Sequence, residues 1–149
     1  LFIFLSAPIF AQGVDNEDLQ VIQSIYGKEK KEMLKSFLML SDADAAKFWP
    51  VYEAYEVERK AQGKRRVALI TEYVNTYGAA DDAKLDKMTL ESIKINTDSD
   101  KLLGKYYGKM KKAVGAKNAA KFFQFETYML LAVKESIYDN IPFIDELGK

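Results

Sequence analysis

The sequence predicts an all-α fold of four long antiparallel helices, arranged as helical hairpins in a bundle-like domain. Apolar residues recur with a period near 3.6 rather than in alternation, which is typical of amphipathic helices. Only 8 Gly and 3 Pro occur among the 149 residues, so few positions interrupt that pattern. Short connections between the periodic stretches place neighbouring helices antiparallel. We therefore expect one helical domain over residues 12–149, preceded by a segment of a different kind.

That first segment, LFIFLSAPIFA over residues 1–11, carries no charged side chain. As a helix it would span roughly 16 Å, about half of the hydrocarbon core of a bilayer. The small residue Ala11 precedes Gln12 and an acidic stretch, a pattern typical of the end of a secretory signal peptide. We interpret residues 1–11 as a signal-peptide remnant. The alternatives are an N-terminal helix buried in the fold and a lipid-contacting anchor.

The first helix is predicted over residues 16–39. Asp15 and Asn16 offer an N-cap, and the acidic side chains that follow favour the positive end of the helix dipole. Its inward-facing residues, taken from the helical spacing, are Leu19, Ile22, Tyr26, Met33 and Phe37.

The second helix is predicted to begin at Ser41 and to end near Tyr77. Ser41 followed three residues later by Asp44 resembles a capping box. Pro50 predicts a kink at that point or a break just before it. Gly78 is expected to end the helix in the left-handed conformation. The apolar stripe of this helix consists of Phe48, Tyr52, Tyr55, Leu69 and Tyr73.

A third helix is expected to start with Asp81 or Asp82 as its cap and to end at Gly115. A fourth then covers about residues 116–138 and stops before Ile141-Pro142. The expected inward residues are Leu85, Met88, Ile95, Leu102, Tyr106 and Met110 in the third helix, and Phe122, Phe125, Met129, Val133 and Ile137 in the fourth.

The polar middles of the second and third helices, residues 56–66 and 91–101, carry matching charges. Folding these helices about the turn near residues 79 and 80 brings opposite charges together along the hairpin. Because each exposed pair contributes only about 0–1 kcal/mol, the pairs set the register more than the stability. The expected oppositions are Arg59 and Lys60 with Asp98 and Asp100, and Glu53, Glu56 and Glu58 with Lys101 and Lys105.

The composition excludes several classes of site. The chain has no His and no Cys, which excludes disulfides, thiolate metal sites, a cysteine nucleophile and a Ser-His-Asp triad. Its 22 basic and 22 acidic residues balance, and this argues against a general nucleic-acid binder. Glu126, the one acid within an aromatic stretch, is expected to be a buried site residue, or to pair with an Arg or Lys, or to lie on the polar face of its helix. We expect no catalytic, cofactor-binding or metal-binding residues, and no enzyme.

A run of lysines on the third helix is the main candidate site. Between Lys101 and Lys121 there are seven Lys and no acid. With Tyr106 and Tyr107 interleaved, such a face is typical of nucleic-acid or anionic-membrane binding, and its mixed apolar and basic character also suits a protein partner. The alternative is a solvated helix face partly neutralised by the glutamates of the second helix, and the basic segment at 64–66 has the same alternative. The candidate partner-binding residues are Lys101, Lys105, Lys109, Lys112 and Tyr107.

Two segments resemble small secreted bacterial helical proteins near the Spy/CpxP-like periplasmic family. They are LSDADAAKFWPVYEAYEVERK at 40–60 and KYYGKMKKAVGAKNAAKFFQFE at 105–126. The hallmark of that family is a repeated L-T-x-x-Q motif; here Leu40-Ser41 begins the pattern, Asp44 takes the Gln position, and no second copy occurs. The resemblance implies an all-helical periplasmic stress protein. Spy-type members bind unfolded clients without ATP as cradle-shaped dimers, so a homodimer is also implied.

The sequence thus favours a non-enzymatic extracytoplasmic binding protein without a cofactor, chaperone-like or related to envelope stress. Its expected partner is a protein or an unfolded client rather than nucleic acid, and its expected location is periplasmic or secreted. Two alternatives stay open. One is a structural or assembly partner of another envelope protein, and the other is a membrane-surface binder acting through the lysine face.

Overall fold

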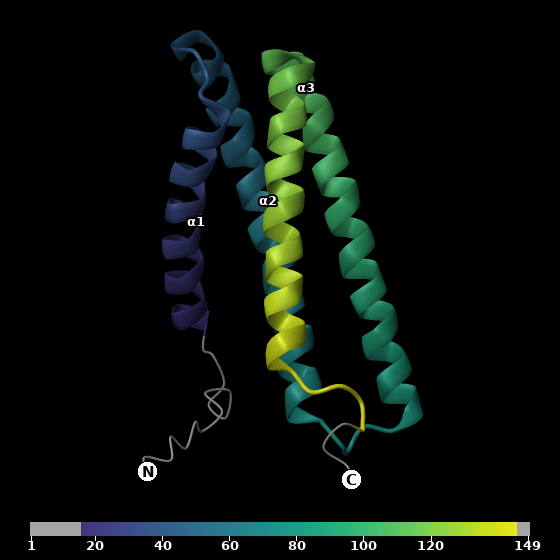
Figure 1. Ribbon diagram of the computed structural model, residues 1–149. Helices are drawn as coiled ribbons and strands as arrows, with labels where there is room; N and C mark the ends of the chain where they lie inside the picture. The colour runs from purple at the N-terminus through teal and green to yellow at the C-terminus, as the bar shows by residue number, and fades with distance from the viewer. Residues whose placement is uncertain (1–15, 146–149) are drawn as a thin grey trace, which may run out of the picture. The chain divides into compact units, whose positions relative to one another are not determined.

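The computed structural model describes residues 16–145, with side chains described from Gly27 onward. Over these residues it contains three helices and no strand: α1 (Asn16–Leu38), α2 (Asp42–Asn75) and α3 (Asp82–Asn140) (Figure 1). The all-α prediction is confirmed for this part of the chain. The predicted signal-peptide remnant, residues 1–11, lies outside the described residues.

The chain divides into two compact units, Leu1–Met33 and Leu34–Lys149, with the boundary inside α1. The prediction of a single domain over residues 12–149 stays a prediction. The second unit contains the last turn of α1, all of α2 and all of α3. The core and the sites described below belong to this second unit.

The prediction of four helices is wrong in its count, because the expected third and fourth helices form the single element α3. The interruption lies at Gly115, the one residue inside α3 with non-helical angles (φ 81°, ψ 167°). Helical residues flank Gly115 directly on both sides, so α3 is described as one element with a single sharp bend. We call residues 82–114 the first arm and residues 116–140 the second arm.

The two arms of α3 nevertheless fold back on each other at Gly115. Tyr107 and Phe123 are sixteen residues apart, which corresponds to about 24 Å along a straight helix. Their ring centroids lie only 6.1 Å apart. In Figure 1 the green and yellow parts of α3 run side by side in opposite directions. The reversal needs φ and ψ values open almost only to glycine, which explains why Gly115 stands there.

Both ends of α2 follow from local sequence. The Ser41 hydroxyl accepts a hydrogen bond from the Asp44 backbone N–H at 3.2 Å, as the capping pattern predicts. The helix runs without a break past Pro50, so the expected break before this residue is absent. Because Ala46 and Pro50 are both exposed, the carbonyl group that loses its donor lies on the water-facing side. The helix ends at Asn75, and Gly78 adopts a left-handed φ of 72° just beyond it.

The last turn of α1 buries a different face from the one predicted. Leu34 and Leu38 are 0% and 1% exposed, whereas the predicted inward residues Met33 and Phe37 are 52% and 43% exposed. The buried face is therefore rotated by one residue, or about 100°, from the predicted one. Phe37 still packs its ring against Phe125, with centroids 6.0 Å apart.

Charged side chains link α2 to the first arm of α3 in nearly the predicted register. Lys105 Nζ lies 2.8 Å from the Glu58 carboxylate, which is one of the predicted oppositions. Arg65 contacts Glu91 at 2.9 Å and Asp98 at 2.8 Å. These pairs confirm an antiparallel hairpin between the two helices.

The predicted pairing of Arg59 with Asp98 does not form. Arg59 instead binds Glu56 on its own helix, three residues away, at 2.7 Å. Asp98 is bound instead by Arg65 of α2, whose long side chain also contacts Glu91.

An aromatic cluster forms the centre of the core. Phe122 of the second arm contacts three rings of α2, with centroid distances of 6.1 Å to Phe48, 6.4 Å to Tyr52 and 5.3 Å to Tyr55. Tyr55 also meets Tyr106 of the first arm at 5.4 Å. All five side chains are 0–1% exposed, so this part of the predicted core is confirmed.

Replacing Gly115 by Ala should destabilise the protein by about 1–3 kcal/mol, because a Cβ is strained at these backbone angles. Urea unfolding followed by circular dichroism measures the change. Gly104→Ala is the matched control, since Gly104 is helical and a Cβ there meets nothing within 4 Å. The control should be stabilised by about 0.5–1 kcal/mol. Equal effects of the two substitutions would show that the turn does not depend on glycine.

Candidate functional site

The predicted lysine face is present on the first arm of α3. Spacings of four, four and three residues place its lysines on one side of the helix. All four of these side chains are exposed. We call this set the lysine stripe: Lys101, Lys105, Lys109 and Lys112.

Part of the lysine stripe is neutralised by α2. Lys105 Nζ lies 2.8 Å from both carboxylate oxygens of Glu58. The Tyr106 hydroxyl donates to Glu58 Oε1 at 2.7 Å, and Lys109 Nζ lies 4.7 Å from the centroid of the Tyr106 ring. The hydrogen bonds from Lys105 and Tyr106 hold the pKa of Glu58 below its ordinary value. Half of the stripe therefore contacts Glu58 or Tyr106 directly, as the alternative of a partly neutralised face predicts.

The structure does not bring Tyr107 to the lysine stripe. Tyr107 follows Lys105 by two residues, which places it about 200° round the helix. Its ring meets Phe123 of the second arm edge-on. Of the five predicted partner-binding residues, the four lysines share a face and Tyr107 helps to join the two arms.

Glu126 lies in the core and is 0% exposed. The Tyr55 hydroxyl donates to Glu126 Oε2 at 2.9 Å. Burial, followed by the nearby Glu126 carboxylate, raises the pKa of Tyr55 above its ordinary value, so its hydroxyl keeps the proton that it donates. Through this hydrogen bond the buried Glu126 joins the second arm to α2.

A second candidate site was not predicted: an apolar groove at the end of the hairpin where α2 stops and α3 begins. It has a volume of about 260 Å³. Its walls come from α2, both arms of α3 and the segment that follows α3. We call it the tip groove. Its apolar walls include Leu69, Ile70, Met88, Ile95 and Ile137.

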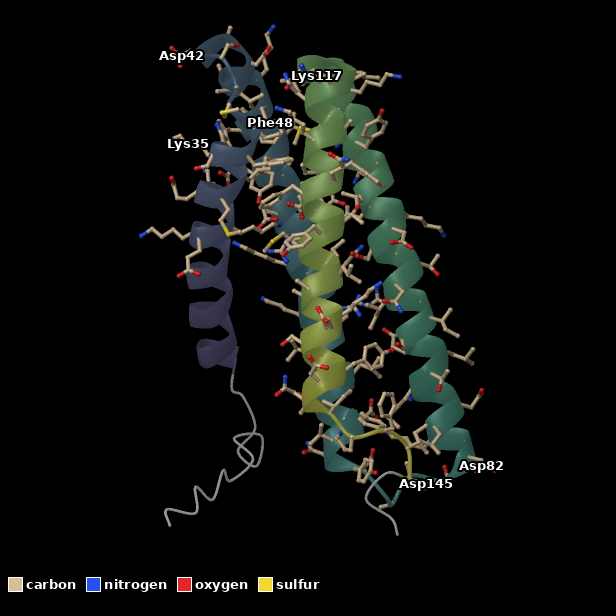
Figure 2. All side chains as sticks on the ribbon, in the orientation of Figure 1. Lys35, Asp42, Phe48, Asp82, Lys117 and Asp145 are labelled. Atoms are coloured by element: carbon tan, nitrogen blue, oxygen red, sulfur yellow. The ribbon has the colours of Figure 1, made fainter. Side chains whose placement is uncertain are left out.

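Residues 141–145, which we call the strap, close one side of the tip groove. The Tyr73 hydroxyl donates to the Pro142 carbonyl at 2.7 Å, and the Tyr77 hydroxyl donates to the Phe143 carbonyl at 2.8 Å. Figure 2 shows Asp145, at the end of the strap, on the same end of the hairpin as Asp82. Tyr73 of α2 and Tyr77 in the turn just after it therefore hold the chain across this end.

Two cations, Arg66 and Lys134, lie among the lining residues of the tip groove, and none of these residues is Asp or Glu. Arg66 Nη2 donates to Asn96 Oδ1 at 3.2 Å. Burial lowers the pKa of Arg66, because the partly desolvated guanidinium gains no carboxylate in compensation. The acid of the strap, Asp145, lines a smaller adjoining cavity.

The basic segment at 64–66 was the only sequence signal near the tip groove. Its three side chains have different fates: Lys64 is exposed, Arg65 pairs with acids of the first arm, and Arg66 lines the groove. Periodicity indicated the apolar walls as core residues. Periodicity does not show that these apolar side chains leave a space between the helices; only the tertiary structure shows it.

Comparison of the chain with protein-family models, curated proteins and solved structures gives no match. Among residues 16–145, no group of three or more His, Cys, Asp or Glu is placed to hold a metal ion. None of the helices that the structure describes combines the length and the apolar character needed to cross a membrane.

Tyr106 should titrate late, because burial and then the hydrogen bond to Glu58 raise its pKa to about 12. Folding therefore favours the neutral hydroxyl. This contribution to stability is complete below about pH 10 and is lost as the pH rises through 12. Glu58→Gln should lower the pKa of Tyr106, which tyrosine ring NMR measures after assignment with Tyr106→Phe. Glu135→Gln, an exposed site on the second arm, should leave it unchanged. Equal titration in all variants would rule out the Glu58 contact.

Removing both strap-holding hydroxyls with Tyr73→Phe and Tyr77→Phe should release the strap. Each lost hydrogen bond costs about 0.5–1.5 kcal/mol. Cleavage by chymotrypsin after Phe143 should then become several-fold faster. Tyr128→Phe, at an exposed tyrosine of the second arm, is the control. Unchanged cleavage in the double variant would mean that these hydrogen bonds do not hold the strap.

Proposed function

We propose that this chain is a non-enzymatic binding protein that works outside the cytoplasm and holds unfolded client polypeptides in a chaperone-like manner. The observation that supports this is the exposure of large apolar side chains in pairs on both arms of α3. Leu90 and Ile93 are 57% and 56% exposed on the first arm, and Tyr128 and Leu131 are 66% and 63% exposed on the second. A spacing of three residues puts each pair on one side of its helix.

The first arm offers an apolar contact and a positively charged contact, so it would bind a client segment that is both apolar and acidic. The pair Leu90 and Ile93 lies N-terminal to the lysine stripe on the same helix. Weak contacts of this kind suit a protein that holds varied sequences rather than one partner. The resemblance to Spy/CpxP-like proteins supports the same function, the extracytoplasmic location and a homodimeric assembly.

Binding to an anionic membrane is the weaker alternative for the lysine stripe. A helix that lies in a membrane interface needs an apolar face that it can bury in the lipid. The apolar face of the first arm is taken up by the core, where Leu102, Tyr106 and Met110 are 6%, 1% and 0% exposed. The lysines therefore have no accessible apolar face on the same helix turns.

The test is suppression of insulin aggregation after reduction with dithiothreitol. This client suits the protein because its own chain has no Cys for the reductant to alter. We expect a several-fold molar excess of the protein to suppress light scattering. The combined variant Leu90→Ser, Ile93→Ser, Tyr128→Ser and Leu131→Ser should lose at least half of that effect, and so should Lys101→Gln, Lys109→Gln and Lys112→Gln together.

The control variant carries Lys35→Gln, Lys47→Gln and Lys64→Gln, which remove the same charge from exposed positions outside α3. It should protect the client as well as the unchanged protein does. Absence of any protection at several-fold excess contradicts the proposal. A stable stoichiometric complex with one envelope protein, without client protection, would instead support an assembly role.

A further inference from the structure

The tip groove combines an apolar interior with positive charge that the protein does not neutralise. Its lining contains Arg66 and Lys134 but no acid, and neither cation takes part in an ion pair among the described residues. This contrasts with the neighbouring Arg65, which contacts both Glu91 and Asp98. Leaving a half-buried cation without a carboxylate costs free energy, and an anionic ligand would recover it.

We propose that the tip groove binds an amphipathic anion, with an aliphatic chain against the apolar walls and an anionic head group on Arg66 and Lys134. The chain would lie against Leu69, Met88, Ile95 and Ile137. A planar guanidinium suits a carboxylate or a phosphate because it offers paired N–H donors. This inference goes beyond the proposed function, because the tip groove shares no residue with the lysine stripe or the exposed apolar pairs.

Polar groups beside Arg66 extend the head-group end of the groove. Ser92 and Asn96 lie one turn apart on the first arm and both line the cavity. Asn96 already accepts a hydrogen bond from Arg66, which orients the guanidinium without neutralising it. A few polar groups at one end of an apolar cavity are the usual arrangement for fixing the orientation of a small ligand.

The size of the groove limits the ligand to a single chain. Its 260 Å³ lies just below the range of roughly 300–1,000 Å³ typical of ligand pockets. One medium-length aliphatic chain fits such a space, whereas a two-chain lipid does not. The strap supplies a further apolar wall through Ile141 and Pro142, so it would cover part of the bound chain.

The experiment compares three ten-carbon probes by isothermal titration calorimetry, each kept below its self-association concentration: decanoate, decyl phosphate and decanol. We expect decanoate to bind with one-to-one stoichiometry and at least about tenfold more tightly than decanol, which has the same chain and no charge. Tighter binding of decyl phosphate than of decanoate also supports the proposal and would show that the groove prefers a phosphate to a carboxylate head group.

Two variants separate the head-group site from the chain site. Arg66→Gln with Lys134→Gln should remove the preference for decanoate over decanol. The control, Lys47→Gln with Lys64→Gln, makes the same charge change and should keep the preference; Lys64 lies about 200° round α2 from Arg66. Ser92→Phe fills the groove and should abolish binding of all three probes. Intermolecular NOEs from the probe chain to the Met88 and Ile95 methyl groups locate the ligand without any substitution.

Three results would overturn the proposal. Equal affinity for decanoate and decanol would mean that the groove does not recognise a head group. Decanoate binding without NOEs to Met88 or Ile95 would place the ligand elsewhere. No binding of any of the three probes to the folded protein would show that the groove holds no aliphatic chain. Since client protection does not enter these measurements, each result is independent of the proposed function.

Discussion

The reversal of the chain at Gly115 is the constraint on which the rest of the second unit depends. It turns the second arm of α3 back along the first, and this brings Phe122 against Phe48, Tyr52 and Tyr55 of α2. The same reversal carries Lys134 and the strap to the end of the hairpin where α3 began. Both the aromatic core and the tip groove therefore depend on Gly115, which adopts a backbone conformation that is strained for residues with a Cβ.

The two ends of the hairpin differ in how completely they are packed. Around Phe122 large rings from three helical segments interlock, and the buried Glu126 receives a hydrogen bond from Tyr55. Towards the strap, aliphatic side chains such as Leu69 and Ile137 line a groove together with the rings of Tyr73 and Tyr138, and an open space of about 260 Å³ is left between them. Close packing is the norm in protein interiors, so an apolar space of this size with uncompensated charge at its edge points to a ligand rather than to poor packing.

Charge has different roles at different places along α2. Arg59 binds Glu56 on its own helix, and Arg65 joins α2 to the first arm through Glu91 and Asp98. Glu58 neutralises Lys105 of the lysine stripe and also accepts a hydrogen bond from the Tyr106 hydroxyl. Exposed pairs of this kind contribute little to stability individually, but they set which residues of the two helices face each other. Arg66, without a carboxylate, stands apart from this pattern.

Local sequence by itself determined the helical class, the Ser41 cap, a cap at Asp81 or Asp82, and the break at Gly115. It also determined the inward positions of Phe48, Tyr55, Tyr106 and Phe122. These features follow from hydrogen bonds within one turn, from the steric freedom of glycine and from the helical period. Only the tertiary structure decided that Phe37 is half-exposed, that Tyr107 faces Phe123, and that Arg66 alone of three consecutive cations lines a groove. The helical period assigns a residue to a face, but what covers that face depends on the rotation and register of the neighbouring helix, which are set by contacts distant in sequence.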